Sequence, residues 1–315
     1  MAQHFFDAKI DNLHGTFFNQ LAPIGHIKSG DLLAGTTLDS RWHHAKQPDL
    51  RAYEHLTELK GRRERDKGHA LIGPIWVEDA KPGDVLEVEV GAIEIGHWGW
   101  SVCGGWPTPL NARLDIEAPP SAYLMWQIDA EQRAAVNQFG DQVSLNPFPG
   151  IIGVMPAEAG QHSTIPPRLT GGNLDCALLT TGARLFLPVA VDGAGLSFGD
   201  GHAVQGNGEV GGVAIECPFE RIELKVVLHK SLGWTRPRAW TPAGERMTFG
   251  FDVDLNEAWL QALNDMVKWL MHDFEIDRRR AISLCSIGAD LHITQVANRT
   301  CGVHCVWNGQ VKIAT

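Results

Sequence analysis

Apolar and polar residues alternate strictly along several stretches of the chain. The alternation is clearest over 86–90, 222–228 and 247–255, where every second residue is apolar. A period of two predicts half-buried β-strands, because successive side chains of a strand point to opposite faces. Two short stretches, 28–33 (KSGDLL) and 81–86 (KPGDVL), repeat one glycine turn before such a strand. The pattern predicts a mainly β fold of sandwich-like sheets and hints at a duplicated unit.

A helical period is clear only near the C-terminus. From Trp259 to Phe274 apolar residues recur at spacings of three and four, and Asn256 is the expected N-cap. A second helix is expected from about Asp277 to Gln295, with a break near Gly288. A last strand is expected over 303–307. The chain should therefore carry a small C-terminal α part.

Composition narrows the class of protein. The 315 residues are 44% hydrophobic and 20% charged, which suits a folded chain with a sizeable core. No linker is visible, so we expect a single domain over 1–315; a weaker alternative divides it into an N-terminal β part, 1–150, and a motif-bearing part, 151–315. The net charge of −10 argues against nucleic acid as a partner.

Other features of the composition bear on the protein's environment. No apolar run approaches the roughly 20 residues that span a bilayer, and the N-terminal residues lack the apolar core of a signal peptide. Six cysteines are spread thinly over the chain. We therefore expect no membrane association and a cytoplasmic protein with reduced thiols.

The stretch 199–209 (GDGHAVQGNGE) combines flexible backbone with side chains that bind metals. Residues 206–211 match G-x-G-x-x-G, but strand-like residues at 213–215 and 222–228 follow where a dinucleotide site needs a helix. Asp200 and His202 are two residues apart, so an extended backbone points both to one side. Carboxylate and imidazole ligands suit zinc or a similar ion. The alternative is a solvated turn in which the polar side chains stabilise only the backbone.

The residues around this stretch favour the metal site. They include 166–175 (PPRLTGGNLD), the apolar run 185–191 and residues 199–216. Further motifs are found at 69–77 (HALIGPIWV), 82–86 (PGDVL), 153–157 (GVMPA) and 290–296 (DLHITQV). Together they resemble the acetamidase/formamidase family of small-amide hydrolases over most of the chain. The sequence departs from the family pattern at Asn207, where an aspartate is usual; the change removes a charge but keeps a ligand oxygen.

The resemblance implies a metal-dependent hydrolase that splits a small linear amide into ammonia and a carboxylate. By resemblance and residue type, Asp175, Asp200 and His202 are the expected ligands of a divalent metal, zinc first and calcium as the alternative. Glu209 is the expected general base and later acid, and Glu216 is its rival for that role. The resemblance also leads us to expect a homo-oligomer, a dimer or higher.

Two further residues are candidates for substrate binding. Asn173 has an amide that would orient the substrate, and the alternative is that it stabilises the Gly171-Gly172 turn. His69 matches a histidine of the family pattern. It is either a further ligand or proton shuttle, or a hydrogen-bonded histidine at the start of a strand.

Several other motifs are given structural interpretations. The tryptophan-rich segment 97–106 is expected in a core or interface, with a carbohydrate surface as the alternative. Residues 301–305 (CGVHC) predict a strand with Cys301, Val303 and Cys305 on one face and His304 on the other, so the thiols should be buried. Two competing functions remain: a non-catalytic, metal-stabilised β-sandwich binding module, and an amidase with Cys217 as nucleophile.

Overall fold

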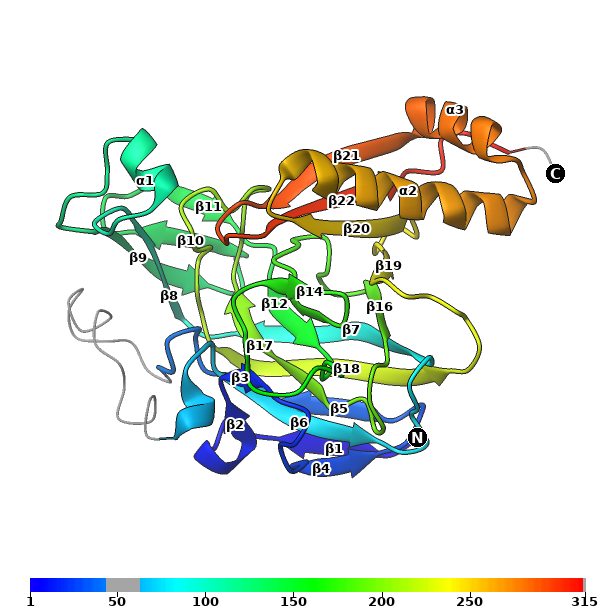
Figure 1. The fold of residues 1–315 in the computed structure, drawn as a ribbon. Coiled ribbons are helices and arrows are strands. Elements are labelled where there is room, and N and C mark those ends of the chain that lie inside the picture. The colour runs from blue at the N-terminus through cyan, green and yellow to red at the C-terminus, as the bar shows by residue number, and fades with distance from the viewer. Residues whose placement is uncertain (44–62, 314–315) are drawn as a thin grey trace.

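The computed structural model describes residues 1–43 and 63–313. Strands dominate this part of the chain, and the two long α-helices are C-terminal. The expected mainly β class with a small C-terminal α part is therefore confirmed. Figure 1 shows the C-terminal helices and strands above a body of stacked sheets. The largest sheet runs in the order β1 (Gln3–Phe6), β5 (Leu32–Gly35), β18 (Phe219–His229), β7 (Val85–Ile95), β16 (Arg184–Pro188), β19 (Arg238–Trp240), β20 (Arg246–Asp252), β22 (Cys301–Trp307) and β21 (Ala289–Gln295).

A second sheet holds most of the motif-bearing residues. Its order is β14 (Pro167–Arg168), β15 (Gly171–Asn173), β12 (Phe148–Gly153), β17 (Leu196–His202), β6 (Leu71–Val77) and β2 (Leu13–His14), with β4 (Gly25–Ile27) also on β6. β12 lies between β15 and β17, pairing Ile151 with both Asn173 and Gly199. This arrangement brings the 171–175 and 199–202 segments to either side of Gly150.

Two smaller sheets complete the described strands. They consist of β8 (Trp98–Cys103), β9 (Ala122–Asp129), β10 (Ala134–Asn137) and β11 (Gln142–Ser144), and of β3 (Thr16–Phe17) with β13 (His162–Ser163). Strands from before and after residue 150 pair with one another in both large sheets, as β7 does with β18 and β6 with β17. Short helical turns occupy Ile10–Asn12, Glu64–Asp66 and α1 (Pro109–Arg113).

The repeated glycine turn of the sequence is built the same way twice. Gly30 and Gly83 both adopt left-handed backbone, with φ of 93° and 92°. In each turn an aspartate side chain accepts the main-chain N–H of the lysine three residues before it, at 3.0 Å for Asp31 and 2.8 Å for Asp84. The strands that follow, β5 and β7, pair with opposite edges of β18.

The first long helix, α2 (Leu255–Phe274), begins earlier than expected. Its N-cap is Asp254, whose carboxylate accepts the N–H of Asn256 at 2.8 Å, so the prediction of Asn256 as the cap is wrong. The alternating run also ends sooner than expected, because β20 stops at Asp252 and Leu255 is the first helical residue.

The predicted second helix is correct only in its first half. α3 spans Arg278–Gly288, and residues 289–295 form strand β21 instead. Leu291 and Ile293 pair with Cys305 and Val303 of β22, so a period of two replaces the helical one after Gly288. Pairing with β22 at the edge of the large sheet provides hydrogen-bond partners for the backbone of this segment. Local periodicity did not predict this pairing.

The cores follow from this arrangement. The main apolar cluster lies between the large sheets, and a second one lies between α2, α3 and one face of β22. Val303 and Cys305 belong to that second cluster while His304 is buried on the other face, as the alternation predicted. Trp98 and Trp100 are buried in a small cluster with Tyr123, which confirms the core interpretation of the tryptophan segment.

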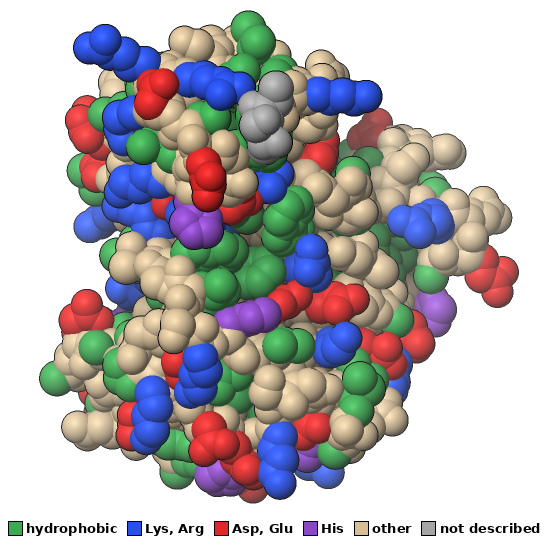
Figure 2. Space-filling model, turned by 90° about the vertical axis from the view of Figure 1, so that its right-hand side faces the viewer, with side chains coloured by type: hydrophobic (Ala, Val, Ile, Leu, Met, Phe, Trp, Pro, Cys, Tyr) green, Lys and Arg blue, Asp and Glu red, His purple; other side chains and the backbone are tan. Residues whose placement is uncertain are grey.

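The surface is mixed in charge on the face that Figure 2 shows, where acidic and basic side chains are interspersed around a central apolar area. No helix of the described chain is long and apolar enough to cross a membrane. The described cysteines are all free thiols.

Candidate functional site

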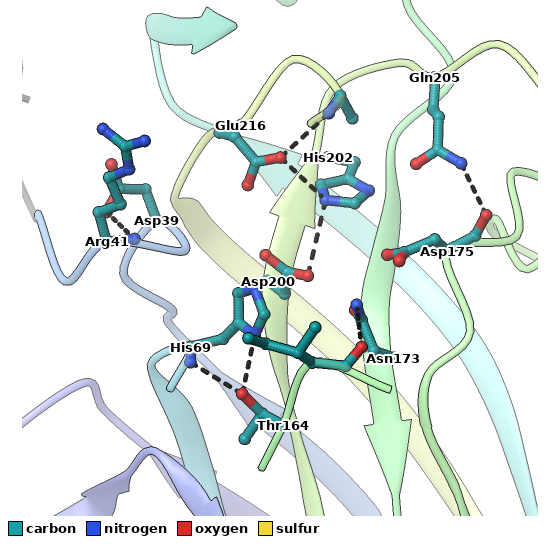
Figure 3. Close-up of polar contacts among 12 residues, drawn as sticks. Asp39, Arg41, His69, Thr164, Asn173, Asp175, Asp200, His202, Gln205 and Glu216 are labelled. Carbon is teal, nitrogen blue, oxygen red and sulfur yellow. Dashed lines mark hydrogen bonds and ion pairs between the residues drawn. The ribbon is translucent and has the colours of Figure 1, made fainter. Parts of the chain in front are cut away.

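Five acidic and imidazole side chains from the 175–216 region converge on one buried point of the second sheet. They are Asp175, Asp200, His202, Glu209 and Glu216, each at most 7% exposed. Ligand atoms of the first three lie within 4.8 Å of one another, and His202 belongs with both glutamates to a second such group. Figure 3 shows Asp175, Asp200, His202 and Glu216 facing one another at the end of β17. The structure thus brings together Asp175, Asp200 and His202, the expected ligands, with both candidate bases.

The backbone at this site is strained at three of the acids. Asp175, Asp200 and Glu209 have φ of 47°, 58° and 44°, the left-handed region that residues with a β-carbon rarely adopt. Each such residue costs roughly 1–3 kcal/mol, and such strain concentrates at functional sites. Asp200 therefore does not reach the site by the regular extended backbone that the sequence argument assumed, although its side chain does lie beside His202.

Hydrogen bonds hold these conformations. The Asp175 carbonyl accepts Nε2 of Gln205 at 2.7 Å. The Glu209 N–H donates to the carbonyl of Gly206 at 3.1 Å, and the Glu209 carbonyl accepts from Gly212 at 2.9 Å. No helix follows the 206–211 motif, which agrees with rejecting a dinucleotide site. Residues 213–215 were expected to form a strand but do not. In this stretch only Glu216 makes isolated β-bridges, to Trp100 and His202.

Gly150 on β12 provides the room for the cluster. A β-carbon at this position would lie 2.7 Å from Cε1 of His202, 2.8 Å from Oδ2 of Asp200 and 2.9 Å from Oδ1 of Asp175. Contacts this short are essentially never made by real β-carbons. The three side chains therefore occupy space that only glycine leaves open.

The converging side chains leave several buried polar atoms without hydrogen-bond partners in the described chain. These atoms are Oδ1 of Asp175, Oδ1 of Asp200, Oε2 of Glu216 and Nδ1 of His202. A buried carboxylate oxygen without a partner is costly unless a cation or donor approaches it. Carboxylate oxygens with one imidazole nitrogen form a donor set that suits zinc, and the carboxylate oxygens alone would suit calcium. The residues therefore fit a divalent metal ion.

Burial and mutual repulsion hold two of the acids toward their neutral forms. Burial, with the charge of Glu209 added, raises the pKa of Asp175 well above its usual range. Burial also raises the pKa of Glu209 to about 8, although His202 nearby opposes the shift. A positive ion among these groups would favour their charged forms.

Asp200 and His202 behave as an ion pair. Burial opposes the charge on Asp200, but the nearby His69 and His202 outweigh it and lower its pKa to about 2. Burial likewise opposes a charge on His202, yet Glu216 and Asp200 raise its pKa well above the ordinary value. Nε2 of His202 lies 3.3 Å from Oε1 of Glu216 and 3.7 Å from Oδ2 of Asp200.

Asn173 and His69 border the cluster. Nδ2 of Asn173 donates to the carbonyl of Ile165 at 2.9 Å, and its Oδ1 is buried without a partner in the described chain. Nδ1 of His69 lies 2.8 Å from Oγ1 of Thr164, which also accepts the His69 main-chain N–H. His69 does not belong to either ligand group but is close enough to influence Asp200.

Other residues that the sequence singled out lie outside the cluster. Asn207 is exposed on the turn before Glu209. Cys217 is fully buried, and burial raises the pKa of its thiol, the opposite of what a cysteine nucleophile needs. Within the cluster, by contrast, Glu216 is tied to the fold by main-chain hydrogen bonds with Trp100, and its Oε1 accepts the Ala214 N–H at 3.1 Å.

Two residues that shape the site, Gly150 and Gln205, were not predicted from the sequence. A glycine inside an apolar strand often marks close approach of another group, and the run 148–153 (FPGIIG) carried that signal. Gln205 lies within the 199–209 motif, but its single bond to the Asp175 carbonyl depends on tertiary placement.

Comparison with known proteins gives one consistent family. A family model described as the Acetamidase/Formamidase family matches residues 3–160 and 157–306. The acetamidase of Mycolicibacterium smegmatis is 31% identical over 200 residues, 45% of this chain and 49% of that protein. The formamidase of Methylophilus methylotrophus is 29% identical over 191 residues, 45% of this chain and 47% of that protein. The chain thus spans about half the length of the curated relatives it matches.

Solved structures are similar over nearly the whole chain. A predicted acetamidase/formamidase of Thermoanaerobacter tengcongensis has a TM-score of 0.83 and 26% identity, covering 98% of this chain and 96% of that one. An acetamidase of Bacillus halodurans has a TM-score of 0.82 and 25% identity, covering 97% and 96%.

Proposed function

The chain belongs to the acetamidase/formamidase family, and from this premise we propose that it is a metal-dependent hydrolase of small linear amides. The reaction adds water across the C–N bond and yields a carboxylate and ammonia. The observation that carries the proposal is the buried convergence of Asp175, Asp200, His202 and the two glutamates, with carboxylate oxygens left unpaired.

Asp175, Asp200 and His202 would hold the metal ion, zinc first and calcium as the alternative. A divalent ion bound there supplies Lewis acidity for the amide carbonyl and lowers the pKa of a water molecule. Unpaired Oδ1 atoms on both aspartates support this assignment.

Glu209 is the proposed general base and later acid. It takes a proton from the attacking water and delivers it to the nitrogen as the C–N bond breaks. It is carried by a turn, whereas Glu216 is held by the Ala214 N–H and lies beside Nε2 of His202. We therefore assign Glu216 the role of orienting the His202 imidazole.

Asn173 is the proposed partner of the substrate amide. Its Nδ2 is already engaged by Ile165, which leaves Oδ1 as a buried acceptor for a substrate N–H. His69, oriented by Thr164, would stabilise the charge of Asp200 and relay protons at the edge of the site.

Three assignments rest on family resemblance and composition alone. We propose a cytoplasmic homo-oligomer, a dimer or higher, with no nucleic-acid partner. Sedimentation of the purified protein would test the subunit number directly.

The proposal is tested by elemental analysis paired with ammonia release from formamide, acetamide and propionamide. One equivalent of metal with turnover of at least one amide would support it. Bound metal without ammonia from any of them would favour the metal-stabilised binding module. Turnover that survives chelation but is lost to a thiol reagent would favour the cysteine mechanism, against which the burial of Cys217 argues.

A further inference from the structure

The face of the C-terminal strands that points away from α2 carries a second set of polar groups. His292 on β21 and His304 on β22 stack with ring centroids 5.0 Å apart. A cavity of about 420 Å³ separates this face from the loops at 146, 177–178 and 205–207. These loops continue directly into the candidate site, since 177–178 follows Asp175 and 205–207 follows His202.

The lining of this cavity is acidic. Glu245 and Asp290 contribute carboxylates, and the other polar groups are two imidazoles and four side-chain amides. No lysine or arginine of the described chain is among the lining residues. Such a lining attracts positive charge and offers mostly hydrogen-bond acceptors.

Two inner groups of the cavity lack partners. His304 is 0% exposed; its Nδ1 lies 2.8 Å from Oγ1 of Thr294, and its Nε2 is buried without a partner in the described chain. Gln205 must turn Nε2 toward the Asp175 carbonyl, so Oε1 is the end that remains, and it too is buried and unpaired.

The protonation of the His304 ring determines what it offers to a ligand. Burial, reinforced by the neighbouring His292, lowers the pKa of His304 to about 3, so the ring is neutral. In the tautomer that donates Nδ1–H to Oγ1 of Thr294, Nε2 presents a lone pair. Nε2 and the Gln205 oxygen are thus two unpaired acceptors on residues that line the cavity, and an N–H donor is the group that would satisfy each of them.

The geometry argues against a second chelated metal. In the described chain, the groups of three or more carboxylate, imidazole or thiol side chains that could share one ion all belong to the 175–216 cluster. The cavity is also far larger than the roughly 30 Å³ that one water molecule occupies. It therefore suits a hydrated cation held by hydrogen bonds.

We propose that this cavity is a binding site for ammonium and small alkylammonium ions. Binding itself follows from the lining; only the identity of the natural ligand, the nitrogen product of amide hydrolysis, rests on the proposed function. Gln205 connects the two sites, because it bonds the main chain of Asp175 and lines the cavity.

The test titrates ¹⁵N-ammonium chloride into protein with ¹³C-labelled histidine at constant ionic strength, without any amide. Potassium and tetramethylammonium chloride are the comparison cations, because neither donates N–H bonds. Ring signals of His292 and His304, assigned from single variants, should shift saturably with ammonium only. The double variant Glu245→Gln/Asp290→Asn should bind about tenfold or more weakly, while Glu94→Gln, a matched change at an exposed acid on β7, should bind as the wild type does.

Equal saturation by potassium or tetramethylammonium, or unchanged ammonium binding in the double variant, would overturn the proposal. The titration needs no turnover, so an inactive protein that binds ammonium would defeat only the proposed function. If turnover is present, ammonium should inhibit it, and the double variant should relieve that inhibition. Active protein without saturable ammonium binding would defeat only the cavity assignment.

Discussion

A β-carbon placed on Gly150 would lie 2.7 Å from Cε1 of His202, a distance that the packed site cannot accommodate. The same carbon would lie within 2.9 Å of carboxylate oxygens on Asp200 and Asp175. One missing methyl group on β12 therefore sets the position of all three proposed metal ligands.

Gly150→Ala should displace these ligands and weaken metal binding about tenfold to hundredfold, because ligand orientation controls affinity. Metal content after dialysis and titration with a zinc indicator measure the effect. Gly206→Ala is the control, since a β-carbon there meets nothing within 4 Å. Equal metal affinity in the two variants would contradict the placement of the metal over Gly150.

Substitution of each glutamate should distinguish the role of Glu209 from that of Glu216. Glu209→Gln should keep its metal and lower kcat about 10²–10⁴-fold, the usual contribution of a general base. Glu216→Gln should instead weaken metal binding and recover much of its turnover at saturating metal, because its proposed role is to orient His202. Metal content and kcat measured together distinguish the roles, and the reverse result would exchange them.

Much of the site was predictable because its residues are close in sequence. Residues 173–216 contain the proposed ligands and both glutamates, and the family motif covers them. The unusual backbone of Asp200 was not predictable, because left-handed conformations at non-glycine residues depend on tertiary hydrogen bonds. Gly150 contributes from a different strand through sheet pairing, which local pattern does not encode.

The fold shows the same division. Strict alternation identified β7, β18 and β20, because apolar side chains line one face of each, although α2 also buries the Thr248 face of β20. The helix prediction failed at residues 289–295, because Leu291 and Ile293 keep a period of two there on an exposed edge strand. Strand order could not be read from the chain, since neighbours such as β7 and β18 are far apart in sequence.

Removal of the metal should lower stability. Without a cation, the four buried acids repel one another and are poorly solvated. A metal ion that binds only the folded state also stabilises that state by mass action. Excess chelator should lower Tm by about 5–10 °C, and zinc should restore it. A Tm indifferent to chelator, in protein shown to be metal-loaded, would contradict this expectation.

The stability of the protein should depend on pH through a histidine outside the site. His14 on β2 is fully buried between the Thr16 carbonyl, 2.8 Å from Nδ1, and Oγ of Ser197, 2.9 Å from Nε2. Burial lowers its pKa from 6.5 to about 4. On acidification, the unfolded chain therefore takes up this proton at a higher pH than the folded protein does. The free energy of unfolding is unaffected by the titration of His14 above pH 6.5 and decreases as the pH falls toward 4.

The free energy of unfolding of the metal-free protein should accordingly fall by about 3 kcal/mol between pH 7.5 and 4 through this residue. Urea unfolding of wild type and His14→Gln across that range measures the difference, with chelator present to remove the metal's own pH dependence. His14→Gln should be less stable at pH 7.5 but lose less stability on acidification, because glutamine does not titrate. Parallel pH curves for the two proteins would show that His14 is not the group that charges on unfolding.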